Sequence, residues 1–128
     1  MKTLIPILIG LLVVGCGTPD SNVTEEATVI QPTREDVVGS YEHKREKLTF
    51  RVVLLDNGVA EHYLNDTKID EDKWRIVGKE IHIEDKDGNV GVHRIGSDGS
   101  LIDIAVIGKD GVRTEYPKYK QDISKKIK

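Results

Sequence analysis

Turn signals divide most of the chain into short pieces of similar length. Glycine-containing turn sequences recur at Asp56-Asn57-Gly58, Gly78-Lys79, Asp87-Gly88, Asp98-Gly99 and Asp110-Gly111. Short runs rich in β-branched residues lie between these turns, and no long segment repeats its apolar side chains with a helical period. Such runs joined by tight turns are typical of antiparallel hairpins. The sequence therefore predicts an all-β domain in which strands do not alternate with helices.

The residues after Gly39 predict about eight short strands. Apolar and polar side chains alternate in several of them, so that Phe50, Val52 and Leu54 share one face. The predicted strands are Ser40–Glu46, Leu48–Asp56, Val59–Asn65, Lys73–Val77, Glu80–Asp85, Asn89–Ile95, Ser100–Ile107 and Val112–Pro117. The side chains predicted to point inward are Phe50, Val52, Trp74, Ile81, Ile83, Val92, Ile104 and Val106. The acidic segment from Asn65 to Asp72 is predicted to be a solvent-facing loop.

The lengths of two turns predict the register of the strands that they join. A two-residue loop at Gly78-Lys79 and a three-residue loop at Ser97-Asp98-Gly99 both keep apolar faces together, whereas a slip of one residue would turn them to the other side. The cross-strand pairs predicted in this way are Ile76–Ile81, Trp74–Ile83, Val92–Ile104 and Val90–Val106.

A sheet of about eight short strands must protect its two edges from pairing with other chains. Curling the antiparallel meander into a small barrel or half-barrel hides those edges from other chains. Aromatic residues make up only 5% of the chain, so the core is expected to consist mainly of Val, Ile and Leu. Because the strands are short for a wide cup, we expect the interior to be filled by the protein's own side chains.

The first 15 residues have the features of an export signal. Lys2 precedes an apolar segment, Leu4–Val14, which as a helix would be about 16 Å long and too short to cross the ~30 Å core of a bilayer. The sequence Val13-Val14-Gly15-Cys16 resembles the lipobox of bacterial lipoproteins, in which an aliphatic and a small residue precede a lipidated cysteine. This resemblance implies cleavage before Cys16, lipidation of its thiol and attachment to a membrane through several acyl chains.

The residues after the cysteine suggest where such a protein would reside. Gly17 stands where enterobacteria-like sorting uses an aspartate to retain a lipoprotein in the inner membrane, so the resemblance implies the outer membrane, facing the periplasm. Residues 16–36 are polar and include two prolines, which predicts a flexible linker. A short helix at Arg34–Val38, with Thr33 as its N-cap, is predicted at the end of this linker.

The start of the β domain carries a second resemblance. Gly39-Ser40-Tyr41 is similar to the glycine-plus-aromatic beginning of the first strand in lipocalin-like barrels among bacterial envelope lipoproteins. This resemblance implies a lipocalin-like barrel or half-barrel over residues 37–117. It identifies no ligand and no functional residue in this chain.

Two histidines are candidates for a metal site. If Asp87-Gly88 forms a two-residue loop, His82 lies directly opposite His93, and Glu84 is on the same face. Two imidazoles and a carboxylate could hold part of the coordination shell of zinc or copper. A three-residue loop at this turn would separate the two histidines instead, and both registers remain open at this point.

Other functional classes find little support in the sequence. The net charge is −3, and no strongly basic domain is present that would indicate nucleic-acid binding. We find no nucleophile motif, no phosphate-binding loop and no sign of a cofactor, so an enzyme is not expected. Residues 118–128 form a basic tail with five lysines and one aspartate, predicted to be either a frayed helix or a last edge strand.

These observations give one expected organisation and two expected functions. A signal peptide (1–15) is followed by the linker (16–36), the β domain (37–117) and the basic tail (118–128). The first expected function is that of a lipid-anchored, non-catalytic envelope protein that binds a partner protein or supports the envelope. The alternative is a lipocalin-like carrier of a small apolar ligand, which requires the inward-facing side chains to line an open lumen.

Overall fold

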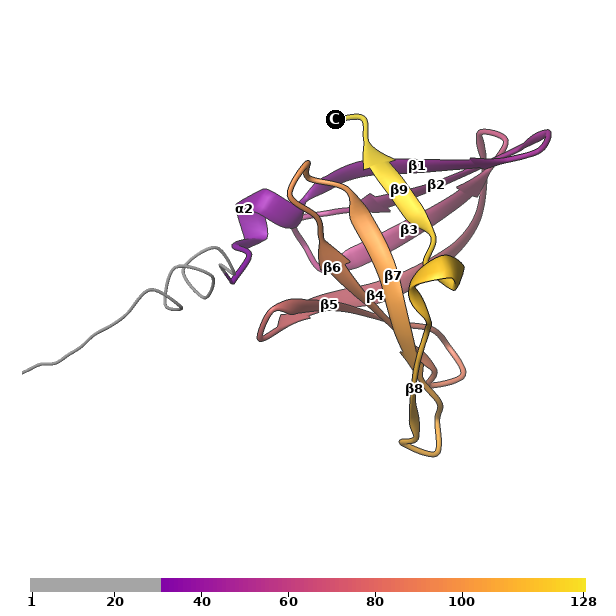
Figure 1. Ribbon diagram of the computed structural model, residues 1–128. Helices are drawn as coiled ribbons and strands as arrows, with labels where there is room; N and C mark the ends of the chain where they lie inside the picture. The colour runs from indigo at the N-terminus through magenta and orange to yellow at the C-terminus, as the bar shows by residue number, and fades with distance from the viewer. Residues whose placement is uncertain (1–30) are drawn as a thin grey trace, which may run out of the picture. The chain divides into compact units, whose positions relative to one another are not determined.

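Nine strands and two very short helices make up residues 31–128, the part of the chain that the computed structural model describes (Figure 1). Residues 32–128 form one compact unit. The elements are α2 (Arg34–Val37), β1 (Gly39–Arg45), β2 (Leu48–Leu54), β3 (Val59–Leu64), β4 (Thr67–Val77), β5 (Glu80–Glu84), β6 (Val90–Ile95), β7 (Leu101–Ile107), β8 (Arg113–Glu115), the 3-10 helix η2 (Lys118–Lys120) and β9 (Ile123–Lys126).

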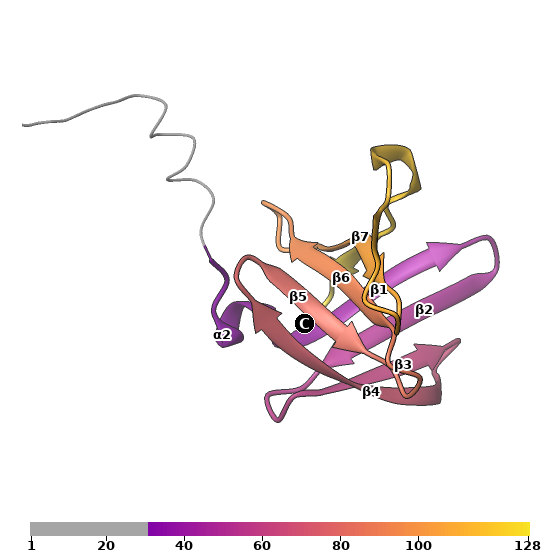
Figure 2. The same ribbon diagram turned by 90° about the horizontal axis from the view of Figure 1, so that it is seen from below.

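Eight of the strands close into an antiparallel barrel, which confirms the predicted fold class. The sheet order is β6-β5-β4-β3-β2-β1-β9-β7-β8, and an additional pairing between β6 and β7 closes the ring and leaves β8 as an extra strand. Figure 2 shows β3 and β4 on one side of the interior and β6 and β7 on the other. Because the ring is closed, it has no open sheet edge, as we expect for a sheet of many short strands.

The tail supplies the strand that closes the ring. β9 pairs with β1 through Tyr41↔Lys126 and with β7 through Leu101↔Ser124. It is therefore an internal strand with a partner on each side, rather than a frayed helix or an edge strand. β8 pairs with the other half of β7, from Ala105 to Ile107, and η2 lies in the chain between β8 and β9.

Helix α2 covers one end of the barrel. It begins at the predicted N-cap, Thr33, whose hydroxyl accepts a hydrogen bond from the backbone N–H of Asp36 at 3.2 Å. Val37 is fully buried, and its carbonyl accepts a 2.5 Å hydrogen bond from the hydroxyl of Tyr41. The guanidinium of Arg34 stacks over the ring of Trp74 at 4.6 Å. These contacts attach the helix to the barrel.

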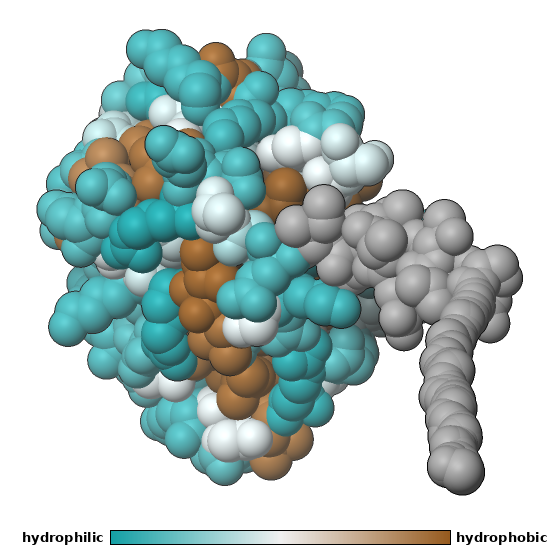
Figure 3. Space-filling model, turned by 90° about the vertical axis from the view of Figure 1, so that its left-hand side faces the viewer, coloured by the Kyte–Doolittle hydropathy of each residue, from teal (hydrophilic) through white to brown (hydrophobic). Residues whose placement is uncertain are grey.

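The core plug beneath α2 fills this end of the barrel with apolar side chains. It consists of Val37, Tyr41, Leu54, Ala60, Trp74, Ile81, Ile83 and Leu101. The indole N–H of Trp74 donates a 2.8 Å hydrogen bond to the carbonyl of Leu55, so its one polar atom is paired within the core. On the face shown in Figure 3 hydrophilic residues predominate, and the longest apolar stretch is a narrow band that runs from the centre to the bottom of the view.

The strand registers follow the turns where the strands are regular. The pairs Ile76↔Ile81 and Trp74↔Ile83 confirm the register predicted from Gly78-Lys79. In the hairpin of β6 and β7 the predicted pairs are wrong by one residue, because a bulge after Val92 shifts the register. The observed partners there are Val90↔Ile107 and Val92↔Ala105.

Two of the side chains predicted to point inward lie on the other face of the sheet. Val92 and Ile104, both predicted to face the interior, belong instead to a second apolar cluster with Val90, Ala105 and Ile107. Their neighbours Gly91 and His93 line the interior, and side chains alternate between the two faces of a strand. This second cluster therefore lies on the outer face of the barrel.

The prediction of an acidic loop from Asn65 to Asp72 is wrong as well. Most of this segment belongs to β4, which begins at Thr67 and runs for 11 residues. The connection from β3 is only Asn65 and Asp66, both with positive φ angles of 49° and 71°. Asparagine and aspartate tolerate this left-handed conformation better than most residues, so the turn is compatible with its sequence.

Candidate functional site

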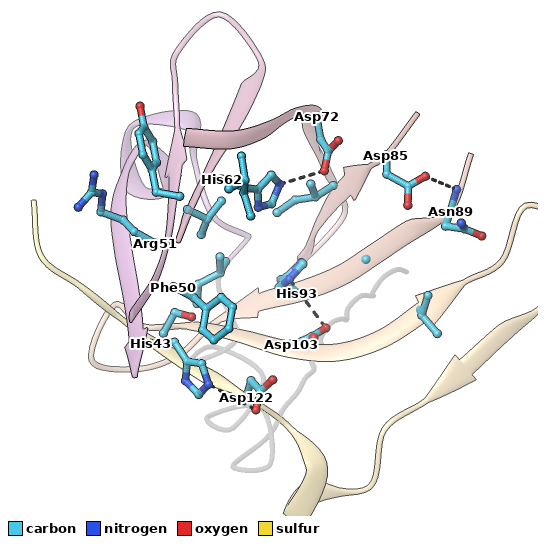
Figure 4. Close-up of a pocket in the computed structure, with 18 of the residues that line it drawn as sticks. His43, Phe50, Arg51, His62, Asp72, Asp85, Asn89, His93, Asp103 and Asp122 are labelled. Atoms are coloured by element: carbon cyan, nitrogen blue, oxygen red, sulfur yellow. Dashed lines mark hydrogen bonds and ion pairs between the residues drawn. The ribbon is translucent and has the colours of Figure 1, made fainter. Parts of the chain in front are cut away.

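The half of the barrel away from α2 contains an open cavity. Its volume is about 510 Å³, and its lining includes the apolar residues Phe50, Val52, Ile83, Leu101 and Val106 (Figure 4). The interior is thus only half filled by the protein's own side chains, and the expectation of a completely plugged interior is wrong. The core plug forms the floor of the cavity.

The cavity is polar because the inward-facing positions change character along each strand. At the end of the barrel that α2 covers, the inward-facing residue of a strand is apolar and either belongs to the core plug or packs against it. Two residues further along, the same face supplies a histidine or an aspartate to the cavity. The apolar and polar members of each strand are Tyr41 and His43, Ala60 and His62, Trp74 and Asp72, Ile95 and His93, and Leu101 and Asp103.

Three histidine–aspartate pairs line the cavity wall. His62 Nε2 lies 2.9 Å from an oxygen of Asp72, and His93 Nε2 lies 3.8 Å from Asp103. The third pair joins His43 Nε2 to Asp122 at 3.9 Å. Each pair connects neighbouring strands or the chain just before β9, as Figure 4 shows.

Several polar atoms on this wall have no hydrogen-bond partner in the protein. They are Nε2 of His43, Nε2 of His62, Nδ1 of His93 and Oδ1 of Asp72. The contact between His62 and Asp72 is close but is not aligned as a hydrogen bond, and it is an ion pair only when His62 is protonated. Buried polar atoms without partners are uncommon, because each forfeits its hydrogen bonds to water.

Burial shifts the pKa values of two facing groups in opposite directions. The pKa of Asp103 is raised from 3.8 to about 6, first by desolvation and then by the negative charge of Asp122. The pKa of His93 is lowered from 6.5 to about 4, mainly by desolvation. At neutral pH the carboxylate of Asp103 is therefore ionised, and the imidazole that faces it is neutral.

The arginines near the cavity already have partners. Arg45 donates two hydrogen bonds to Asp122, at 3.1 and 3.2 Å, and Arg51 donates one to Asp66 at 2.9 Å. Both pairs lie at the rim, where the side chains of these arginines are partly exposed. The positive charges at the mouth are thus balanced and do not neutralise the carboxylates inside.

Gly91 lies on the wall in β6, between β5 and β7, with the His93 imidazole close beside it. A Cβ atom placed there would lie 3.1 Å from Cε1 of His93 and 3.8 Å from the carbonyl oxygen of Ile83. The φ angle of Gly91 is not positive, so the residue is not required by the backbone conformation. A larger side chain at this position would occupy the cavity.

The three residues predicted as a metal site lie apart. The structure has the second of the two possible registers, in which His93 pairs with Ile81 and His82 pairs with Val92, so the two histidines point to opposite faces. His82 Nε2 lies 3.0 Å from Glu80 on the outer face, and Glu84 accepts a hydrogen bond from Arg75. Within residues 31–128 no three His, Cys, Asp or Glu side chains are placed to hold a metal ion.

The predicted lipidation site, Cys16, lies outside the described residues, as do the signal peptide and most of the linker. Among the residues that the structure describes, no helix combines the length and the apolar character needed to cross a membrane.

Sequence reasoning did not identify the histidines and aspartates of the cavity as a group. One signal was available, because His43 and His62 each lie two residues from an apolar side chain that points inward. A polar residue in the inward phase of a barrel strand indicates a lumen that is not completely apolar. Asp103 was assigned to the outer face, because Ile102 and Ile104 beside it were predicted to point inward.

A scan against protein-family models and searches of curated proteins and of solved structures find no match to this chain. The cavity and its lining are therefore the main guide to function.

Proposed function

We propose that this protein binds a small molecule in the open half of its barrel, without catalysis, while acyl chains on Cys16 hold it at a bacterial envelope membrane. The observation that carries the binding function is the cavity of about 510 Å³ above the core plug. Ligand sites of small proteins commonly have volumes of roughly 300–1,000 Å³ and combine apolar walls with a few polar groups.

The distribution of apolar side chains favours the cavity over an external docking face. The large apolar side chains exposed within residues 31–128 are spread over different elements, such as Leu48 in β2, Ile69 in β4, Val112 before β8 and Tyr119 in η2. Single exposed apolar residues are normal on protein surfaces. A small-molecule carrier therefore has more support than a module that binds a partner protein.

Titration with a neutral fluorescent probe tests the binding function. N-phenyl-1-naphthylamine becomes bright in apolar surroundings and can be titrated into protein that begins at residue 32, which retains the whole compact unit. We expect saturable binding with one site. The variant Gly91→Leu, which places a leucine in the lumen, should lose this signal, whereas Thr114→Leu, which places a leucine outside on exposed β8, should retain it. Equal binding by both variants would contradict a lumen site.

The membrane anchor needs a separate test. The full chain, expressed in a bacterium with its own lipoprotein-processing enzymes, should partition with membranes, and mass spectrometry should show acyl chains on Cys16. The variant Cys16→Ala should remain unmodified and lose this partitioning. Unchanged partitioning of Cys16→Ala would remove the anchor from the proposal and leave the binding function unaffected.

A further inference from the structure

Two carboxylates of the cavity have neither an arginine partner nor a turn that occupies them. Asp122 is paired with Arg45, and Asp85 closes its own turn by accepting hydrogen bonds from the backbone N–H groups of Asp87 and Asn89. Asp72 and Asp103 remain, and the cavity groups that face them are imidazoles. The His93 imidazole is neutral at pH 7 because burial lowers its pKa, so it leaves the charge of Asp103 in place.

The two carboxylates lie on opposite parts of the cavity wall. Asp72 is on β4 and Asp103 is on β7, with β5 and β6 between them in the barrel. Neighbouring strands are about 4.8 Å apart, so the separation measured along the wall is about 14 Å. In Figure 4 the two residues appear at opposite sides of the lumen, with His62 beside the first and His93 beside the second.

The cavity wall around Asp72 lacks a hydrogen-bond donor for one of its carboxylate oxygens. The Asp72 side chain is only 10% exposed, and its Oδ1 atom has no hydrogen-bond partner. Burial raises its pKa, although the nearby His62 acts in the opposite direction. A buried carboxylate oxygen without a donor is costly, and a ligand that brings an N–H group would satisfy it.

We propose that the ligand of this cavity is a small organic cation, an amine or guanidine on an apolar body, whose N–H groups bind Asp103 or Asp72. The apolar body packs against Phe50, Val52 and Ile83. An anionic ligand would add another negative charge beside the ionised carboxylate of Asp103 and would offer no hydrogen-bond donor to Asp72, so it is disfavoured. This inference rests on the proposed binding function and specifies the chemistry of its ligand.

Three compounds with one ring system separate the charge of the ligand from its shape. Tryptamine is a cation, tryptophol is its neutral counterpart, and indole-3-propionate is an anion of similar size. Each is titrated by calorimetry into the full chain in a non-ionic detergent at pH 7, with detergent alone as the blank. We expect tryptamine to bind about tenfold or more tightly than tryptophol, since hydrogen bonds to charged groups are the stronger ones, and indole-3-propionate to bind most weakly.

Variants assign the preference to the two carboxylates. Asp103→Asn and Asp72→Asn should each weaken tryptamine binding about threefold to tenfold and leave tryptophol unchanged. Asp103→Glu keeps the charge and should preserve the preference for the cation. Glu42→Gln removes a carboxylate from the outer phase of β1, between inward-facing Tyr41 and His43, and should change neither affinity. Circular dichroism confirms that each variant retains its β structure.

The outcomes distinguish this inference from the binding function on which it rests. Binding of tryptophol or indole-3-propionate as tight as that of tryptamine would overturn the cation preference and leave the carrier function standing. The same conclusion follows if none of the three binds while the neutral naphthylamine probe does. An equal loss of tryptamine binding in Glu42→Gln and Asp103→Asn would show that the preference comes from overall charge rather than from the lumen.

Discussion

Removing the charge of Asp103 should make the protein more stable at neutral pH, even though a histidine faces it at 3.8 Å. The folded-state pKa of Asp103 is about 6 rather than 3.8, so its ionised form is less stable in the folded protein than in the unfolded chain. The full difference corresponds to about 3 kcal/mol, and the exposure of a third of the side chain reduces this to about 1–2 kcal/mol. Asp103→Asn should recover that amount at pH 7.

The sign of the effect depends on pH, which makes the prediction specific. As the pH falls from 6 to 3.8, the folded protein takes up a proton on Asp103 before the unfolded chain does, so the penalty of the wild type disappears. His93 acts in the opposite sense. Its pKa falls from 6.5 to about 4 on folding, so about 3 kcal/mol of stability is present above pH 6.5 and lost by pH 4.

These two groups partly compensate each other in the wild type. Between pH 7 and pH 4 their combined effect is a loss of about 1–2 kcal/mol, whereas Asp103→Asn retains only the His93 contribution and should lose about 3 kcal/mol. The two proteins should therefore differ at pH 7 and converge near pH 4. Asp122 and Tyr116, the other titratable groups that interact with Asp103, are present in both proteins.

Urea unfolding, followed by the fluorescence of the single tryptophan, measures these free energies. Trp74 is 3% exposed in the core plug, so its emission should shift on unfolding. Glu42→Gln is the matched control and should stay within about 0.5 kcal/mol of the wild type at both pH values. A lower stability of Asp103→Asn at pH 7 would refute the reasoning, because it would mean that attraction to His93 outweighs the cost of burying the carboxylate.

Two further substitutions and one truncation test how the barrel is held together. Tyr41→Phe removes the buried hydrogen bond to the Val37 carbonyl and should lower the free energy of unfolding by about 1–2 kcal/mol in urea titrations, with little change if that bond contributes nothing. Gly39 has a φ of 153°, and in Gly39→Ala the added Cβ atom would lie 2.4 Å from the Lys128 carbonyl oxygen. The free energy of unfolding from urea titrations should therefore fall by about 1–3 kcal/mol. An unchanged urea midpoint would contradict this steric argument. A chain that ends at Gln121 lacks β9 and should unfold without a sharp transition and bind an apolar dye, whereas a sharp transition would show that β9 is dispensable.

The sequence was a sufficient guide wherever local chemistry determines the structure. Glycine at position 78 and the apolar alternation on both sides predicted the register of β4 and β5, and Thr33 predicted the start of α2. The bulges after His62 and Val92 have no comparable local signal, because the extra residue in each of them, Ile69 and Ile104, is an isoleucine and not a glycine. Bulges depend on how a strand fits its neighbours, and each one changes the face to which the following side chains point.

The cavity depends on these same non-local features. Asp103 and Val106 both line the cavity although they are three residues apart, because the register shifts after Val92 and leaves Ile104 as an extra residue between them, and Asp72 joins the wall because β4 begins at Thr67 rather than at the predicted Lys73. β9 was also hard to predict, since its four residues include one apolar side chain, Ile123, and two adjacent lysines, with no alternation. Pairing on both sides, rather than intrinsic preference, holds such a short segment in a strand.

The position of β9 has a consequence for how the barrel forms. β1 and β7 are separated by more than fifty residues, and the segment that lies between them follows all the other strands in the chain. The ring therefore remains open during synthesis until residues 123–126 have emerged, and contacts between such distant segments form slowly. A nascent chain would thus keep an open sheet, and its lumen would be able to enclose a ligand only after the final step of folding.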